Sequence, residues 1–133
     1  MGSIKTVTEN EVARVMAVAT KQYKKIVWHT SNITIKYSLG MKEYIDLFHA
    51  IIDGCTSPSG ECVIAIVDFS IRVNVISAYS NVELPSDSEK LFDAVYSTDL
   101  YDIVCKNANT RQIESIVSSI YRMIDIWGDK DVN

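Results

Sequence analysis

The sequence predicts an α+β fold: a helix-dominated single domain with one N-terminal β-hairpin packed on a helical bundle. Three observations support this prediction. The chain has 133 residues, of which 47% are apolar, so one domain of ordinary size can form a core without disulfide or metal support. Most segments carry apolar residues three and four positions apart, as amphipathic helices do. Residues 26–39 instead show the β-branched and aromatic alternation of paired strands.

The first helix is expected over about residues 9–24. Thr8 and Glu11 have the spacing of a capping box, in which each side chain bonds the backbone of the other residue. The apolar residues that follow share one helical face: Val12, Val15, Met16 and Ala19. The pattern predicts an amphipathic helix.

Residues 26–29 and 33–39 are predicted to form the hairpin, joined by Thr30–Asn32. Apolar and polar residues alternate in the second strand, which gives it one dry and one wet face. The dry face consists of Ile33, Ile35, Tyr37 and Leu39. Because two strands alone are marginally stable, this face is expected to pack on helices.

The rest of the chain reads as helices separated by loops. The predicted helices lie near residues 41–53, 62–80, 87–97, 99–106 and 111–127. Residues 56–60 form a loop by composition, and Gly128 is expected to close the last helix. Residues 1–133 are predicted to form one domain, with 1–7 and 129–133 as frayed tails.

Residues 62–80 are the most apolar run and fit either a long strand or a buried helix. The run from Glu61 to Ser80 contains no Gly or Pro, and strands rarely exceed about ten residues. Length therefore favours a central helix. It is not expected to cross a membrane, because each charge at its centre would cost about 2.5–3.5 kcal/mol.

Asp68 and Arg72 lie four residues apart in this run, with Asn74 close by. The spacing makes the two charges neighbours on a helix. They could form a catalytic acid tuned by a guanidinium or a structural ion pair. No nucleophile or metal partner accompanies them, so the structural ion pair is favoured. If the pair is buried, removing one partner should cost about 3–5 kcal/mol.

No other pattern predicts catalysis or a cofactor. His29 and His49 have no second ligand at metal-binding spacing, and nucleotide-binding and nucleophile-elbow motifs are absent. The three cysteines form an odd set without a CxxC; Cys62 and Cys105 are interpreted as small buried residues. The expectation is a protein that is not an enzyme, with no catalytic, cofactor or metal residues. The cysteine usage and the lack of a secretory signal indicate the cytoplasm.

The charges are unevenly distributed. Residues 1–42 carry seven bases and two acids, whereas residues 43–133 carry six bases and fifteen acids. The acidic residues between 83 and 102 form a candidate interaction surface: Glu83, Asp87, Glu89, Asp93, Asp99 and Asp102. Ordinary solvated charge, which also favours helix N-termini, is the preferred interpretation of this segment. The asymmetry is compatible with head-to-tail self-association or with separate partners.

A basic cluster formed by Lys21, Lys24 and Lys25 precedes Trp28, which could in principle supply a stacking platform for nucleic acid. The acidic pI of about 5.1 and the shortness of the basic run argue against nucleic-acid binding. A protein partner or self-association is expected, and no membrane.

The runs FSIRVNVISAYSNVELP (69–85) and DAVYSTDLYDIV (93–104), followed by an Ile-rich amphipathic helix, resemble small proteins encoded among the virion-structural genes of tailed phages and prophages of Firmicutes. The likeness spans about residues 33–127 and carries no chemical motif. It implies a non-enzymatic virion or assembly protein in the host cytoplasm or virion. The alternative is a phage-encoded inhibitor that docks its acidic surface on a host nucleic-acid-binding defence complex.

Overall fold

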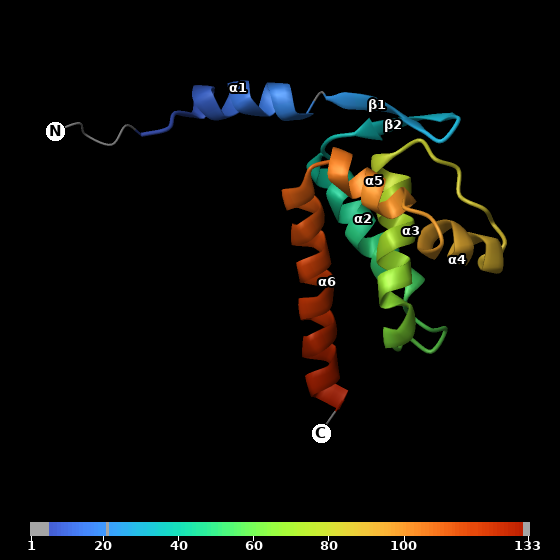
Figure 1. Cartoon of the computed structure of the whole chain (residues 1–133). Helices are drawn as coiled ribbons and strands as arrows, with labels where there is room; N and C mark the ends of the chain where they lie inside the picture. Colours follow the sequence, from blue (N-terminus) through green and yellow to red (C-terminus); the bar gives the residue numbers. More distant parts are fainter. Residues whose placement is uncertain (1–5, 21, 132–133) are drawn as a thin grey trace.

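A computed structural model describes residues 6–20 and 22–131 (Figure 1). The elements in chain order are α1 (Glu9–Thr20), β1 (Tyr23–Trp28), β2 (Ser31–Lys36), α2 (Met41–Gly54), the 3₁₀ turn η1 (Ile64–Ile66), α3 (Val67–Tyr79), α4 (Ser88–Tyr96), α5 (Leu100–Asn107) and α6 (Thr110–Asp131). The predicted α+β, helix-dominated fold with one N-terminal hairpin is confirmed. One cluster of buried apolar side chains joins β2 to α2, α3, α4, α5 and α6.

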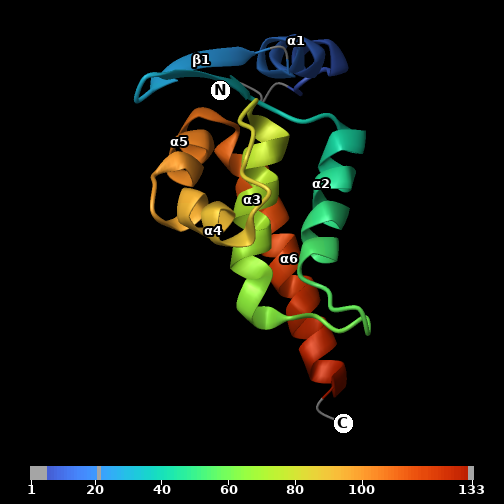
Figure 2. The same cartoon turned by 90° about the vertical axis from the view of Figure 1, so that its right-hand side faces the viewer.

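Helix α3 is the centre of the body, which we define as β2 with α2–α6. It packs on α2 along one side and on α4 and α5 along the other (Figure 2). Val75 and Ile76 are fully buried, and Tyr79 at its end is also inaccessible. The helical interpretation of the longest apolar run is therefore confirmed for residues 67–79.

The beginning of that run is not α-helical: residues 62–63 are extended and 64–66 form the 3₁₀ turn η1, which corrects the prediction of one helix starting at residue 62. Cys62 pairs with Thr56 in an isolated β-bridge, and the Val63 N–H donates to the Cys55 carbonyl at 2.7 Å. The bridge holds this segment extended until η1 leads into α3. Ile64 is 72% exposed, so the expectation of burial all round is also wrong at this end.

The hairpin starts earlier than predicted and turns earlier. β1 and β2 are antiparallel from the pair Tyr23–Lys36 to the pair Trp28–Ser31, so the turn consists of His29 and Thr30. The predicted first helix therefore ends at Thr20 instead of residue 24, because the next residues pair with β2. His29 has φ 56°, as the first central position of a tight hairpin turn can require.

The dry face of the hairpin is confirmed in β2. Ile33 and Ile35 are buried against the helices, and Ile35 also bridges to Ser80 at the end of α3. The strand ends at Lys36, three residues before the predicted end. Beyond it, the Tyr37 carbonyl accepts from the Asn109 N–H at 2.7 Å, which joins this segment to the start of α6.

The predicted end of the last helix also differs from the structure. α4 and α5 lie within one residue of their predicted ranges. α6 continues through Gly128 to Asp131, so the segment 129–131, predicted as part of a frayed tail, is helical. A glycine inside a helix costs about 1 kcal/mol, which weakens a helix without ending it. Residues 1–5 and 132–133 of the predicted tails lie outside the described residues.

Helices α2 and α3 approach each other closely at Gly54. A Cβ atom at this position would lie 2.3 Å from the Ser70 Oγ atom. The buried Ser70 hydroxyl donates to the Ile51 carbonyl at 2.7 Å, and the Asn74 amide donates to the Ser70 carbonyl at 2.8 Å. The missing side chain of Gly54 therefore makes room for a polar contact inside the core.

Gln112 on α6 ties three parts of the body together. Its Oε1 atom accepts from the Leu39 N–H at 2.8 Å and from the Tyr79 hydroxyl at 2.6 Å, and its Nε2 donates to the Leu39 carbonyl at 3.1 Å. The side-chain amide thus supplies hydrogen-bond partners both to the segment after the hairpin and to the end of α3. Sequence analysis did not identify this residue.

Candidate interaction surfaces

The predicted ion pair forms, but at the surface. Arg72 Nε donates to Asp68 Oδ2 at 2.8 Å, and the Asp68 side chain is 51% exposed. The possibility of a buried pair is therefore wrong, because this side of α3 is only partly covered by α4 and α5. Asn74, grouped with the pair in the sequence, faces α2 instead and bonds Ser70.

Three aromatic rings lie beside Asp68 and Arg72, and we call them the aromatic patch: Phe69, Phe92 and Tyr96. The Phe92 and Tyr96 ring centroids are 4.7 Å apart, and Phe69 lies 6.0 Å from Phe92 and 6.1 Å from Tyr96. Phe92 is 52% exposed and Tyr96 39%, so the patch faces solvent. It was not identified from the sequence, because the three residues come from two separate helices.

The ion pair fixes the orientation of this patch. The Tyr96 hydroxyl donates to Asp68 Oδ2 at 2.5 Å, while the Arg72 guanidinium lies 5.1 Å from the Tyr96 ring centroid and 4.7 Å from that of Tyr101. Such cation–π contacts stabilise by about 0.5–1 kcal/mol at exposed sites. Asp68 and Arg72 therefore act as a clamp that joins α3 to α4 and α5.

The titration of these groups follows from their surroundings. Burial raises the pKa of Tyr96 to about 12, and the hydrogen bond to Asp68 adds to this effect. Burial also raises the pKa of Tyr101 and of Tyr121. For Arg72, burial opposes the charged form, but the hydrogen bond and charge of Asp68 outweigh it and raise the pKa. Arg72 and Tyr96, whose pKa values are raised, therefore keep their protons at neutral pH.

The six acidic residues of the candidate surface are all exposed and lie on neighbouring segments. Glu83 is in the connection after α3, Glu89 and Asp93 are on α4, and Asp102 is on α5. Two of the six have structural contacts. Asp87 caps α4 by accepting from the Lys90 N–H at 3.0 Å, and Asp99 accepts from Trp28 Nε1 at 2.8 Å.

The outward face of α4 combines acid with aromatic side chains. Glu89, Phe92, Asp93 and Tyr96 occupy positions i, i+3, i+4 and i+7, so they share one helical face. All four are exposed. Glu89 and Asp93 of the acidic surface therefore share a face of α4 with Phe92 and Tyr96 of the aromatic patch.

The basic cluster does not have the predicted arrangement. Lys24 and Lys25 are successive strand residues and point to opposite faces of β1, while Lys21 lies outside the described residues. Trp28 is half-buried, bonds Asp99 and lies edge-on to His29 with ring centroids 4.8 Å apart. These contacts leave Trp28 unsuited to stacking on nucleic-acid bases.

The histidines and cysteines lie apart from this surface. His29 is in the hairpin turn, and His49 is exposed on α2. Cys55 is buried, whereas Cys62 and Cys105 are half-buried, so burial was assigned to the wrong cysteines. Burial, followed by the neighbouring Cys62 thiol, raises the pKa of Cys55 to about 11. Within residues 6–20 and 22–131, no group of three His, Cys, Asp or Glu could hold a metal ion.

The second surface is the N-terminal arm, which we define as residues 6–20. α1 projects beside the body and away from α4 (Figures 1 and 2). Every side chain from Thr6 to Val18 is exposed, and Val15 and Val18 are 70% and 64% exposed. The predicted helix exists, but Val12, Val15 and Met16 of its predicted apolar face are exposed.

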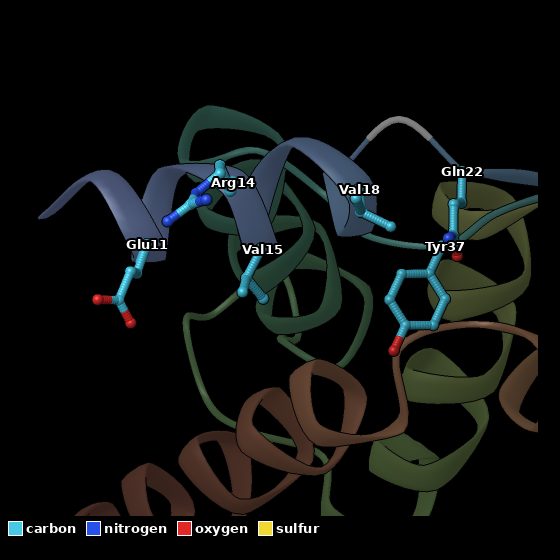
Figure 3. A pocket seen from close by; sticks show the side chains of 6 residues that line it. All are labelled: Glu11, Arg14, Val15, Val18, Gln22 and Tyr37. Carbon is cyan, nitrogen blue, oxygen red and sulfur yellow. The ribbon is translucent and has the colours of Figure 1, made fainter. Parts of the chain in front are cut away.

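A hollow of about 680 Å³ lies between the arm and Tyr37, which follows β2. Figure 3 shows Val15 and Val18 extending from α1, with the Tyr37 ring next to Val18. Glu11, Arg14 and Gln22 complete the lining. Along α1, the positions 11, 14, 15 and 18 repeat the i, i+3, i+4, i+7 spacing of the α4 face.

Comparison with known protein families, with curated proteins and with solved structures gave no match. None of the helices in the described part of the chain is both long and apolar enough to cross a membrane.

Proposed function

We propose that this protein is a non-enzymatic protein-interaction module that acts in phage virion assembly. The exposed apolar arm carries the proposal. An isolated helix shorter than about 12–15 residues is marginal in water, and in α1, which has 12 residues, Val12, Val15 and Val18 are all exposed. Burying one valine side chain contributes about 1.5–3 kcal/mol, so docking on a partner would stabilise the arm.

The aromatic patch supports the same function. Exposed aromatic and arginine side chains often supply the anchors of protein interfaces. Here the clamp of Asp68 and Arg72 holds Tyr96 in place before any partner binds. A pre-ordered anchor loses less conformational entropy on binding than a mobile one.

The setting in a phage virion or in the cytoplasm of its bacterial host rests on the resemblance of residues 69–85 and 93–104 to virion-region proteins. It is tested by affinity capture from infected or lysogenic cells at low and high salt. We expect head, tail or other virion proteins to be captured at both salt concentrations, because apolar contacts are little screened.

The variants for this capture each place aspartate at exposed apolar positions, inside the arm or outside it. The arm variant, Val15→Asp with Val18→Asp, should lose the virion partner, whereas Met41→Asp should retain it. Met41 is 81% exposed and lies at the start of α2, outside both surfaces. Recovery of a host nuclease that is lost at high salt would instead support the inhibitor alternative. Equal capture by all three proteins would refute the role of the arm.

A further inference from the structure

Two of the three cysteines lie together in the connection between α2 and α3, at the end of the body far from the hairpin (Figures 1 and 2). Cys55 directly follows α2, and Cys62 lies two residues before η1. Thr56 and Cys62 form an antiparallel bridge, and the Val63 N–H donates to the Cys55 carbonyl at 2.7 Å. Paired residues of antiparallel strands have Cα atoms about 4.5–5.5 Å apart, and a disulfide spans about 4.4–6.8 Å. The backbone therefore holds Cys55, the neighbour of Thr56, near a separation from Cys62 that a disulfide can span.

A tight turn keeps these two backbone segments together. The Ser57 N–H donates to the Glu61 carbonyl at 2.7 Å, and the Gly60 N–H donates to the Ser57 carbonyl at 2.8 Å. Gly60 has φ 87°, a left-handed conformation that glycine adopts without steric cost. The turn thus fixes the approach of Cys62 to Cys55 before any crosslink forms.

The two thiol groups are neighbours as well. Cys55 caps α2 with φ −117° and ψ 13°, so the alternation of strand side chains does not apply to it. Burial, followed by the charge and the hydrogen bond of the Cys62 thiol, raises the pKa of Cys55 to about 11, so each thiol lies within reach of the other. Cys55 is fully buried, whereas Cys62 is half-buried. Cys62 is therefore the thiol that a dissolved reagent reaches first.

We propose that Cys55 and Cys62 form a reversible disulfide crosslink, made by exchange with a small disulfide such as oxidised glutathione. The Cys62 thiolate attacks one sulfur of the small disulfide and releases the first small thiol. The Cys55 sulfur then attacks the Cys62 sulfur of this mixed disulfide and releases the second small thiol. The two cysteines lose two electrons and two protons, and the two released thiols carry them.

The inference goes beyond the proposed function and does not depend on it. The cytoplasm keeps thiols reduced, whereas disulfides persist outside the cell. Under the proposed function, the connection is therefore uncrosslinked during assembly and crosslinked in the released virion.

The test incubates the purified, reduced protein with oxidised glutathione, alkylates the free thiols and digests the monomeric fraction without reducing agent. A protease that cleaves after glutamate places the three cysteines in separate peptides, residues 44–61, 62–83 and 90–114, because Glu61 lies between Cys55 and Cys62. We expect mass spectrometry to find the first two peptides linked. Titration should find one free thiol instead of three, and dithiothreitol should restore all three.

Three variants identify the residues of the crosslink. Cys105→Ser is the matched control and should give the same linked peptides, because Cys105 lies on α5 beside Tyr101. Cys62→Ser should leave peptide 44–61 unlinked. Cys55→Ser should carry one glutathione on Cys62, because the second step of the exchange is then missing. Circular dichroism verifies that each variant folds, and Cys55→Ala replaces Cys55→Ser if the serine variant does not.

The same exchange in urea separates the contribution of the fold from that of the short spacing in sequence. We expect the equilibrium constant for the crosslink to be larger in the folded protein, on the order of tenfold, because the crosslink and the fold stabilise each other by the same factor. Three results would overturn the inference: a folded protein without the linked peptides, a link through Cys105, and an equilibrium constant no larger than that in urea.

Discussion

The body and the N-terminal arm place similar apolar residues in opposite environments. In α3, Val75 is fully buried among its neighbours, whereas Val15 on α1 is 70% exposed. Both helices carry valines and charged residues, so composition does not separate them. The difference lies in what the rest of the chain places around each helix. The body is stabilised by its own packing, and the arm has a surface available to another molecule.

This contrast predicts that substitutions in the body act on stability and that substitutions in the arm act on association. The expected loss in the free energy of unfolding is largest for a substitution at Gln112 and smallest for substitutions at the valines of the arm.

The largest effect is expected for Gln112→Ala. It leaves the buried Tyr79 hydroxyl and the Leu39 N–H without their acceptor, and each unsatisfied buried group costs about 1–3 kcal/mol. We expect a loss of about 3 kcal/mol in urea unfolding. Adding Tyr79→Phe should recover part of the lost stability, because it removes the hydroxyl left without an acceptor. A loss below about 0.5 kcal/mol for Gln112→Ala would show that water replaces the amide.

Gly54→Ala should follow. The new Cβ would meet the Ser70 hydroxyl, which must move away from the Ile51 carbonyl. Overpacking in cores costs about 1–3 kcal/mol, and we expect about 2 kcal/mol by thermal or urea denaturation. Gly40→Ala is the control, since its Cβ would have no contact closer than 3.8 Å. Equal stability of the two variants would contradict the close approach of α2 and α3.

Alkaline pH should lower the free energy of unfolding of the body, because the pKa values of several of its tyrosines are raised. Burial raises the pKa of Tyr79, Tyr96 and Tyr101 above the ordinary value of 10.0. Between the unfolded and folded pKa values the unfolded chain has lost protons that the native state keeps, so stability falls as pH rises above about 10. The urea midpoint measured from about pH 9 to about pH 11 should decrease. Tyr101→Phe should decrease less steeply, and an identical slope would contradict this assignment.

Asp68→Asn should have a small effect on the stability of the body. The pair with Arg72 is solvent-exposed, and exposed ion pairs contribute about 0.2–1 kcal/mol. We expect a loss of at most about 1 kcal/mol in the free energy of unfolding. Loss of a turnover activity in a normally folded Asp68→Asn protein would contradict the non-enzymatic function.

The smallest effect on stability is expected for the arm variant, Val15→Asp with Val18→Asp. Both side chains are already exposed, and surface substitutions are usually within about 0.5 kcal/mol. Urea unfolding at low protein concentration should therefore match that of the unmodified protein. A loss above about 1 kcal/mol would show that the arm is part of the folded body, and it would remove the contrast between the two regions.

The sequence by itself determined the elements whose signals are local. The three- and four-residue spacing of Leu91 and Val95 and of Ile113 and Ile116 placed α4 and α6, and alternation in residues 33–36 placed β2. The spacing of Asp68 and Arg72 also determined their ion pair, because a helix brings residues four apart together wherever it lies. Such patterns act within one or two turns and need no distant partner.

Only the tertiary structure decided what covers each element. Tyr23 to Lys25 became a strand because β2 pairs with them, and Asp68 stayed exposed because α4 and α5 cover only part of α3. The link from Gln112 to Leu39 and Tyr79 joins residues 73 and 33 positions apart, which no local pattern can indicate. Periodicity shows which side chains can be buried; whether they are buried depends on contacts between residues far apart in the chain. Val15 and Val75 differ for that reason.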